Sequence, residues 1–214
     1  MRIENSSGII LRTRPLTETS VIVHWLTPEL GRVATVAKGA RRPKSSFHGK
    51  LDLFYDCDFS FSRSARSELH TLREVVVRNT REPLRHELGW IQQAAYAAAM
   101  IEQTTETESP LPEIHDLFAS LLVHLPQQPP KPRTVFAFEL KLLRELGLEP
   151  DVNGGKLAAG TEELLTALME SDWSELSELR PTAAQARSVQ QFLHGFLIYH
   201  LGRLPKGRQA ALGV

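Results

Sequence analysis

Five of the thirteen residues from Lys38 to Lys50 are lysine or arginine, and none of the thirteen is acidic. The segment also contains glycine and serine, and it lies between two runs that have the composition of β-strands. Cationic side chains neutralise phosphates, and small residues let the main chain approach a phosphate backbone closely. We therefore expect a surface loop that binds a polyanion. A solvated charged loop without a ligand would have the same composition.

The charges of the chain are balanced overall but unevenly distributed. Lysine plus arginine number 25, as do aspartate plus glutamate. Residues 1–81 contain 14 basic against 8 acidic side chains, a net charge of +6, and residues 82–200 contain 8 against 17, a net charge of −9. The last stretch, 201–214, has three basic side chains and no acidic one. This asymmetry indicates two domains with different partners, the first of which attracts a polyanion.

The elements that would carry the basic segment read as β-strands. Short β-branched or aromatic runs occur at residues 9–11, 21–25, 33–37 and 69–77, and residues 53–62 alternate between apolar and polar. In the alternating run, one face of the strand carries Leu53, Tyr55, Cys57, Phe59 and Phe61. Five strands without a long helix predict a small closed barrel, an OB-fold. An SH3-like barrel has a similar number of strands.

The periodicity becomes helical after Pro83, so the expected fold class is α+β, with a barrel domain at 1–81 and an all-helical domain at 82–214. Apolar residues at helical spacing predict helices over 84–98, about 113–124, 135–146 and 162–170. Thr182 and Gln185 form a capping box that opens a last helix. Gly147 ends the third of these helices.

Sequence patterns typical of enzymes and of metal sites are absent. No phosphate-binding GxxxxGK[ST], GxGxxG, GxSxG or HExxH motif occurs. Cys57 is the single cysteine, which excludes an internal disulfide and a cysteine-rich zinc site. No stretch approaches the ~20 apolar residues that cross a bilayer, and no signal peptide is evident. We expect a cytoplasmic protein that is not an enzyme and has no cofactor, no metal and no membrane contact.

Aromatic residues bear on how a basic barrel would hold a single strand, because bases stack on exposed rings. Phe47 lies within the basic segment and is the predicted stacking residue. Trp25 and Tyr55 lie on predicted strands, and we expect both in the core.

Several blocks of the sequence resemble the bacterial RecO family of DNA repair proteins. Residues 8–14 (GIILRTR), 26–32 (LTPELGR) and 37–45 (AKGARRPKS) resemble its N-terminal domain. Residues 138–143 (FELKLL) resemble its central helix, and 199–203 (YHLGR) with Lys206 and Arg208 resemble its C-terminal motif. These matches keep the family's order and extend from residue 8 to about 208.

The resemblance implies an N-terminal OB-fold, a helical C-terminal domain and no catalysis. It implies a recombination mediator that binds and anneals single-stranded DNA, acts with RecR and in many bacteria RecF, and helps RecA load on DNA coated by single-stranded DNA-binding protein. Many members carry a zinc module after the central helix, but residues 150–157 contain no cysteine, so we expect a short turn there. Gly207 stands where the family usually has serine.

Two groups of residues are the expected binding sites. The DNA-binding surface would comprise Arg12, Arg14, Arg32, Lys38, Arg41, Arg42, Lys44, Phe47 and Lys50. Some family members bind the acidic tail of single-stranded DNA-binding protein on the helical domain. Here an apolar slot with a cationic rim would comprise Arg133, Phe138, Lys141, Leu142, Leu146, Arg203 and Lys206. The sequence leaves two other functions open, an RNA-binding barrel and a protein-only adaptor with a basic loop.

Overall fold

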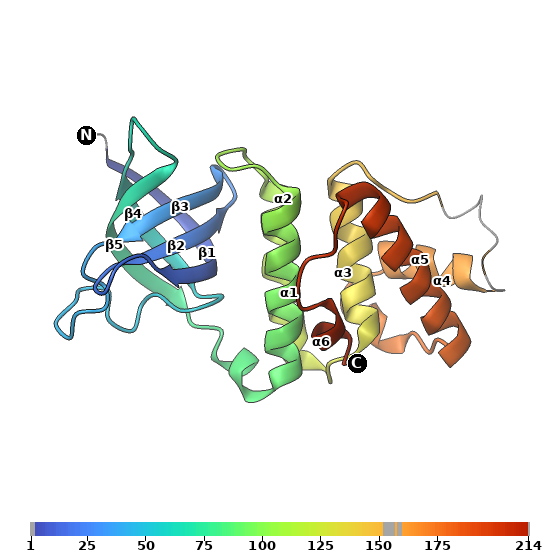
Figure 1. Cartoon of the computed structure of the whole chain (residues 1–214). Helices are drawn as coiled ribbons and strands as arrows, with labels where there is room; N and C mark the ends of the chain where they lie inside the picture. The colour runs from blue at the N-terminus through green and yellow to red at the C-terminus, as the bar shows by residue number, and fades with distance from the viewer. Residues whose placement is uncertain (1–2, 152–156, 158–159, 214) are drawn as a thin grey trace. The chain divides into compact units, whose positions relative to one another are not determined.

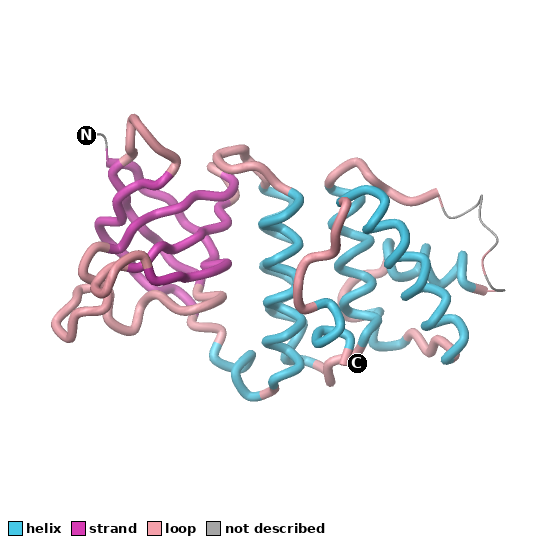
Figure 2. The backbone as a smooth tube through the Cα atoms, in the orientation of Figure 1, coloured by secondary structure: helices cyan, strands magenta, loops and turns pink. Residues whose placement is uncertain are grey.

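The computed structural model describes residues 3–151, 157 and 160–213. Contacts between residues divide the chain into two compact units. The barrel unit comprises residues 1–83 and 105–119, and the helical unit comprises 84–104 and 120–214. The sequence predicts one boundary, after residue 81, whereas the contacts return residues 105–119 to the barrel. Figure 2 shows the strands of the first unit and the helices of the second.

The barrel unit contains five strands that close on themselves in the order β1-β2-β3-β5-β4 (Figure 1). Their bounds are β1 Ile3–Pro15, β2 Val21–Thr27, β3 Gly31–Ala37, β4 Asp56–Ser62 and β5 Leu69–Asn79. β3 and β5 pair in parallel, the other neighbours pair antiparallel, and β1 pairs with β4 to complete the barrel. The predicted OB-fold is confirmed.

The barrel core follows from the alternation of apolar residues along the strands. Cys57 and Phe61 are fully buried on the inner face of β4, and Phe59 is nearly so. The Trp25 ring stacks on Phe59 with 4.1 Å between ring centroids, and its Nε1 donates a hydrogen bond to Thr35 Oγ1 at 2.8 Å. Trp25 is therefore a core residue, as expected, because its ring and its polar N–H are both satisfied inside.

The helical unit contains most of the remaining secondary structure. The α-helices of the chain are α1 Leu88–Thr104, α2 Pro112–His124, α3 Pro132–Glu145, α4 Thr161–Glu170, α5 Ala183–Leu201 and α6 Arg208–Leu212. The part of the chain that the structure describes also has three short 3₁₀ helices, at Glu82–His86, Leu125–Gln127 and Glu175–Glu178. The predicted capping box is confirmed at the start of α5, where Thr182 accepts from the Gln185 N–H and the Gln185 side chain accepts from Thr182 N–H. The turn expected in place of a zinc module lies mostly outside the described residues.

A buried ion pair ties the last helix to the middle of the helical unit. Glu139 of α3 is fully buried, and its carboxylate accepts hydrogen bonds from Arg208 Nε at 2.6 Å and Nη2 at 2.8 Å. Tyr96 Oη of α1 donates to the same carboxylate at 2.6 Å. Gly207 precedes Arg208 with φ of 95°, which a serine would adopt only with strain. The serine that the resemblance implies at this position would therefore strain the start of α6 in this backbone conformation.

Candidate nucleic-acid interface

The basic loop, residues 38–50, is a succession of hydrogen-bonded turns rather than an extended strap. Arg42 N donates to Gly39 O at 3.0 Å, Ser45 N donates to Arg42 O at 3.0 Å, and Lys50 N donates to Phe47 O at 3.1 Å. The loop is also tied to the β1–β2 turn, since Arg41 N donates to Thr19 O at 3.0 Å. These bonds hold the backbone of the basic loop in a defined arrangement beside the β1–β2 turn.

Phe47 is not the exposed stacking residue that the sequence predicts. Its side chain is 8% exposed and belongs to the hydrophobic core of the barrel, together with Trp25 and Phe59. A ring in this position cannot stack on a base unless the loop leaves the barrel. Phe47 instead anchors the basic loop, because burying a phenylalanine side chain stabilises a fold by about 1.5–3 kcal/mol.

Most of the predicted phosphate-binding cations face solvent. Lys38, Arg41, Arg42 and Lys44 are exposed in the loop, and Lys50 is half-buried at its end. Arg12 and Arg14 are exposed on β1. Arg14 is placed near the loop by the sheet, because it lies one residue before the end of β1, and Arg41 Nη1 donates to Thr17 O in the turn that follows at 3.3 Å. The loop and the end of β1 thus form one cationic surface.

The pKa of His24 on β2 is lowered by burial and by the charges of neighbouring arginines. His24 is the register partner of Arg12 on β1. Burial, then the charges of Arg12, Arg14 and Arg32, lower the pKa of His24 from about 6.5 to about 4. Three arginines therefore act on one position of the outer face of β1–β2–β3, and the neutral imidazole adds no further positive charge near neutral pH.

Arg32 has a different role from the other predicted DNA-binding cations. Its Nε donates to Thr105 Oγ1 at 2.7 Å, its Nη2 donates to Thr105 O, and its carbonyl accepts from Glu108 N at 2.9 Å. The side chain is half-buried. Arg32 thus holds residues 105–109 against the start of β3, which makes it a structural residue rather than a free phosphate ligand.

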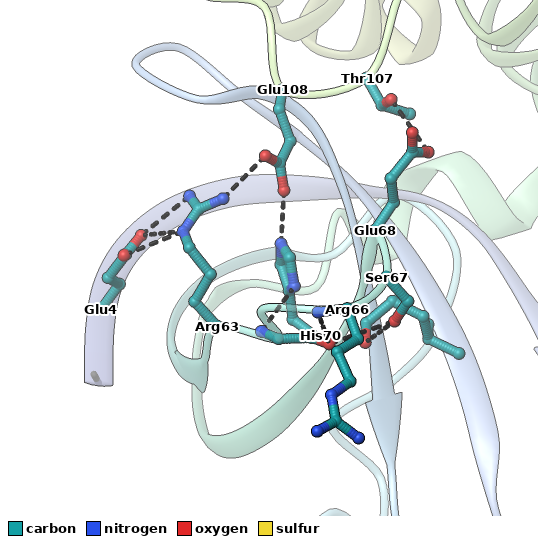
Figure 3. A network of polar contacts seen from close by, with 10 residues as sticks. Glu4, Arg63, Arg66, Ser67, Glu68, His70, Thr107 and Glu108 are labelled. Atoms are coloured by element: carbon teal, nitrogen blue, oxygen red, sulfur yellow. Dashed lines mark hydrogen bonds and ion pairs between the residues drawn. The ribbon is translucent and has the colours of Figure 1, made fainter. Parts of the chain in front are cut away.

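A polar network completes the attachment of residues 105–109 to the barrel (Figure 3). Arg63 forms a two-pronged contact with Glu4, with Nε–Oε1 and Nη2–Oε2 distances of 2.9 Å, and donates to Glu108 Oε2 at 2.7 Å. Glu108 also contacts His70 Nε2, and His70 Nδ1 accepts from Ser64 N at 3.2 Å. Because Nδ1 is an acceptor, the neutral ring carries its proton on Nε2 and donates it to Glu108.

The close approach of this segment also explains a glycine in the family-like block 26–32. Gly31 has φ of 64°, and a Cβ atom there would lie 1.7 Å from Ser109 O. Sequence reasoning missed that residues 105–109 belong to the barrel. The signal was a single glycine, whose partner is more than seventy residues away.

Protonation of the two depressed histidines should make the free energy of unfolding fall in mild acid. Burial and then Arg133 lower the pKa of His124 to about 4, as burial does first for His24. The unfolded chain takes up these protons near pH 6.5, before the folded chain does. Stability is then fully present above about pH 6.5 and declines toward pH 4. In chemical denaturation at a series of pH values, His24→Asn should lose part of the decline, on the order of 2 kcal/mol. The same change at the exposed His194 should leave the decline as it is; equal profiles for wild type and His24→Asn would contradict the assignment.

The slot expected on α3 does not exist with the residues that the sequence suggests. Phe138 and Leu142 are 1% and 0% exposed, respectively, so both are core residues. Lys141 is buried too, and its Nζ donates to Met169 O at 2.9 Å and Ser171 O at 2.8 Å. The face of α3 that carries Phe138 and Leu142 packs against the core of the helical unit, so it does not line a slot. Leu146 is half-buried, while Arg203 and Lys206 are exposed on the C-terminal segment.

A cavity with the expected chemistry lies elsewhere on α3. Its volume is about 310 Å³, and Arg133 lines it together with Phe136, Leu164 and Leu168. Arg180 and Lys131 also line it. The Arg133 guanidinium is held in place, since Nη1 donates to Leu179 O at 3.2 Å and Nη2 to Gln128 Oε1 at 3.1 Å. Of the seven predicted tail-binding residues, only Arg133 lines this cavity.

The described residues hold neither a cluster of metal ligands nor a helix suited to span a membrane. Within residues 3–151, 157 and 160–213, no three His, Cys, Asp or Glu side chains gather as a metal site would require. Cys57 is buried, and burial, then Asp56 and Asp58, raise the pKa of its thiol to about 12. Of the helices in the described part of the chain, none is long and apolar enough to cross a membrane.

A closed five-stranded barrel with this strand order defines the OB-fold class, and this barrel presents a cationic loop. Comparison with protein families agrees. Residues 1–81 match the family described as Recombination protein O N terminal, and residues 91–155 match Recombination protein O C terminal. The chain therefore belongs to the RecO family, whose members act in DNA repair and recombination.

Individual relatives support this assignment over most of the chain. The DNA repair protein RecO of Anaeromyxobacter dehalogenans is 30% identical over 92% of this chain and 91% of its own length. The RecO protein of Rhodopirellula baltica is 29% identical over 83% of this chain and 74% of its own length. That of Bacillus subtilis is 30% identical over 68% of this chain and 56% of its own length.

Proposed function

We propose that this chain binds single-stranded DNA on its barrel unit, anneals complementary strands, and helps RecA load on DNA coated by single-stranded DNA-binding protein. RecR, and RecF where it is present, are the further partners of this proposal. The observation that carries it is the set of exposed cations on a turn-stabilised loop. The proposed DNA ligands are the exposed Lys38, Arg41, Arg42 and Lys44 of the loop, the half-buried Lys50 at its end, and the exposed Arg12 and Arg14 on β1.

The mechanism requires no catalytic step. Two single strands repel one another because each carries one negative charge per nucleotide, and cations that neutralise phosphates lower that repulsion. Contacts to phosphates leave the pairing edges of the bases free. The buried anchor Phe47 keeps the loop on the barrel, so that fewer conformations are lost when DNA binds.

Strand annealing tests the proposal directly. Complementary labelled oligonucleotides should anneal faster with the protein than without it, both as bare strands and when coated by single-stranded DNA-binding protein. A matched pair of RNA strands serves as the comparison. Stronger binding and annealing of RNA would favour an RNA-binding barrel instead, and absence of binding to any strand at low salt would favour the protein-only adaptor.

Access to coated DNA needs a contact with the coating protein, and we assign it to the cavity beside Arg133. An acidic peptide tail that ends in an apolar residue needs an apolar slot with a cationic rim. The apolar slot is lined by Phe136, Leu164 and Leu168, and the cationic rim is formed by Arg133 and Arg180. Its volume of about 310 Å³ lies at the low end of the range of roughly 300–1,000 Å³ for small ligand pockets.

Removing one rim charge should weaken this contact. Arg180 is exposed, and Arg180→Ala leaves the buried packing of the cavity unchanged. We expect affinity for a fluorescent tail peptide to fall roughly fivefold or more, because a charge-assisted hydrogen bond is lost. Lys206→Ala is the matched control, since Lys206 is exposed but does not line the cavity. Equal anisotropy titrations for Arg180→Ala and Lys206→Ala would place the tail elsewhere.

A further inference from the structure

A second cavity lies in the barrel unit and is lined in part by the basic loop. Its volume is about 340 Å³. One wall comes from the loop itself, through Ala40, Phe47 and His48. Thr13 near the end of β1 and Tyr55, which precedes β4, line it as well. Two of its lining residues, Ala40 and Gly49, directly precede Arg41 and Lys50, so cations proposed to bind phosphates adjoin the cavity along the chain.

The lining of this cavity suits a flat aromatic ligand with polar edges. Phe47 and Leu51 contribute apolar surface, and Tyr55 is a partly buried ring packed against the barrel core. His48 is exposed at the cavity and offers ring nitrogens that can form hydrogen bonds. Sites that hold single strands combine a cationic groove with rings on which bases stack. Both features are present here within one stretch of chain.

The backbone fixes Tyr55 in place before any ligand arrives. Phe54 N donates to Ile10 O at 2.8 Å, and Ile10 N donates to Tyr55 O at 3.0 Å. Phe54 has φ of 66°, a left-handed conformation that is costly for a bulky residue. Its ring packs edge-on against Phe118, with 6.2 Å between centroids. Such strain is kept only where the surrounding packing fixes the backbone. Here the left-handed conformation of Phe54 buries its own ring in the core, while the ring of the next residue, Tyr55, lines the cavity.

We propose that this cavity holds one nucleobase of a bound single strand, with Tyr55 as the ring on which the base stacks. This inference rests on the proposed binding of single-stranded DNA and adds a base contact to its phosphate contacts. In this arrangement the phosphates of the strand contact Arg41, Arg42 and Lys44, and one base enters the cavity. Stacking of this kind tolerates any sequence, because every base has a π-face.

The test compares a thymine oligonucleotide with an abasic strand of the same length and charge. Wild-type protein should bind the thymine strand roughly tenfold or more tightly, since stacking on one ring has about this effect on affinity. Tyr55→Leu keeps apolar packing but removes the ring, so the preference should disappear while the dependence of affinity on salt stays the same. Tyr55→Phe keeps the ring and should retain the preference. Replacing Arg41, Arg42 and Lys44 by alanine should have the opposite effect. It should lower the affinity for both the thymine and the abasic strand and preserve the ratio of the two affinities.

A second measurement needs no variant, so poor folding of Tyr55→Leu cannot obscure the result. Irradiation of wild-type protein bound to a strand with 5-iododeoxyuridine should crosslink the base to the peptide that contains Tyr55 or to His48. Equal affinity for thymine and abasic strands, or crosslinks confined to other peptides, would overturn the base site and leave phosphate binding standing. Failure to bind either strand at low salt would remove the proposed function and the base site together.

Discussion

Replacing Arg41, Arg42 and Lys44 by alanine is expected to weaken binding of single-stranded DNA by roughly 100-fold or more at about 50 mM salt. The three side chains are exposed on a loop whose backbone is already ordered by turns. Each phosphate that a cation neutralises contributes about 0.7 to the slope of log affinity against log salt on single strands. If about five phosphates are contacted in all, the slope should change from roughly −3.5 to about −1.4.

The matched control removes the same charge from the same barrel. Arg66, Arg73 and Arg78 are exposed on β5 or just before it, and their replacement by alanine also lowers the net charge by three. Fluorescence anisotropy of a labelled oligonucleotide over a series of salt concentrations measures both variants. A slope that stays at its wild-type value in the loop variant, or that changes equally in the control, would falsify the assignment of the loop as the DNA surface.

Replacing Glu139 by alanine is expected to lower the free energy of unfolding of the helical unit by about 3–5 kcal/mol. Glu139 is fully buried, and its carboxylate balances the charge of Arg208, which is 6% exposed. Without it, Arg208 keeps an uncompensated charge in the interior, and Tyr96 loses the acceptor of its hydroxyl. Burial, then Glu139, raise the pKa of Tyr96, so this hydroxyl stays protonated and needs an acceptor.

Two further variants separate the buried charge from a general effect of mutation. Glu163→Ala removes an exposed carboxylate of α4 and should change stability by less than about 0.5 kcal/mol. Replacing Glu139 and Arg208 together by leucine should recover much of the loss, because no charge remains unpaired. Denaturant titration followed by circular dichroism at 222 nm reports on the helices. If Glu139→Ala and the double variant unfold at the same denaturant concentration, lost packing rather than the unpaired charge is the cause.

Local patterns along the sequence were sufficient for the five strands and for helices α1 to α5. Alternation at Cys57, Phe59 and Phe61 predicts a strand whose inner face is buried, and the capping box at Thr182 predicts the start of α5. Both features arise from residues within one strand or one helical turn, so the neighbours that decide them are near in sequence. The charge of the basic loop is likewise visible in thirteen consecutive residues.

Tertiary structure decided which of the candidate side chains are available to a ligand. A phenylalanine in a polar loop reads as exposed, but Phe47 is buried because the loop folds back on the barrel core. Phe138 and Leu142 share an apolar helix face, and periodicity cannot tell whether that face lines a cavity or the interior. Arg32 is not available as a phosphate ligand because its guanidinium donates a hydrogen bond to Thr105, a residue 73 positions away.

The distance along the chain between interacting residues separates what the sequence by itself determined from what it left open. Short-range patterns determined the strands of the barrel, helices α1 to α5 and the cationic loop, whereas the family followed from blocks of sequence that resemble its members. These patterns left open the cavity at Tyr55, the cavity at Arg133 and the pair of Glu139 with Arg208, which is 69 residues distant. Each of these depends on contacts between segments far apart in the chain, and such contacts form only when the whole fold fixes which faces are covered.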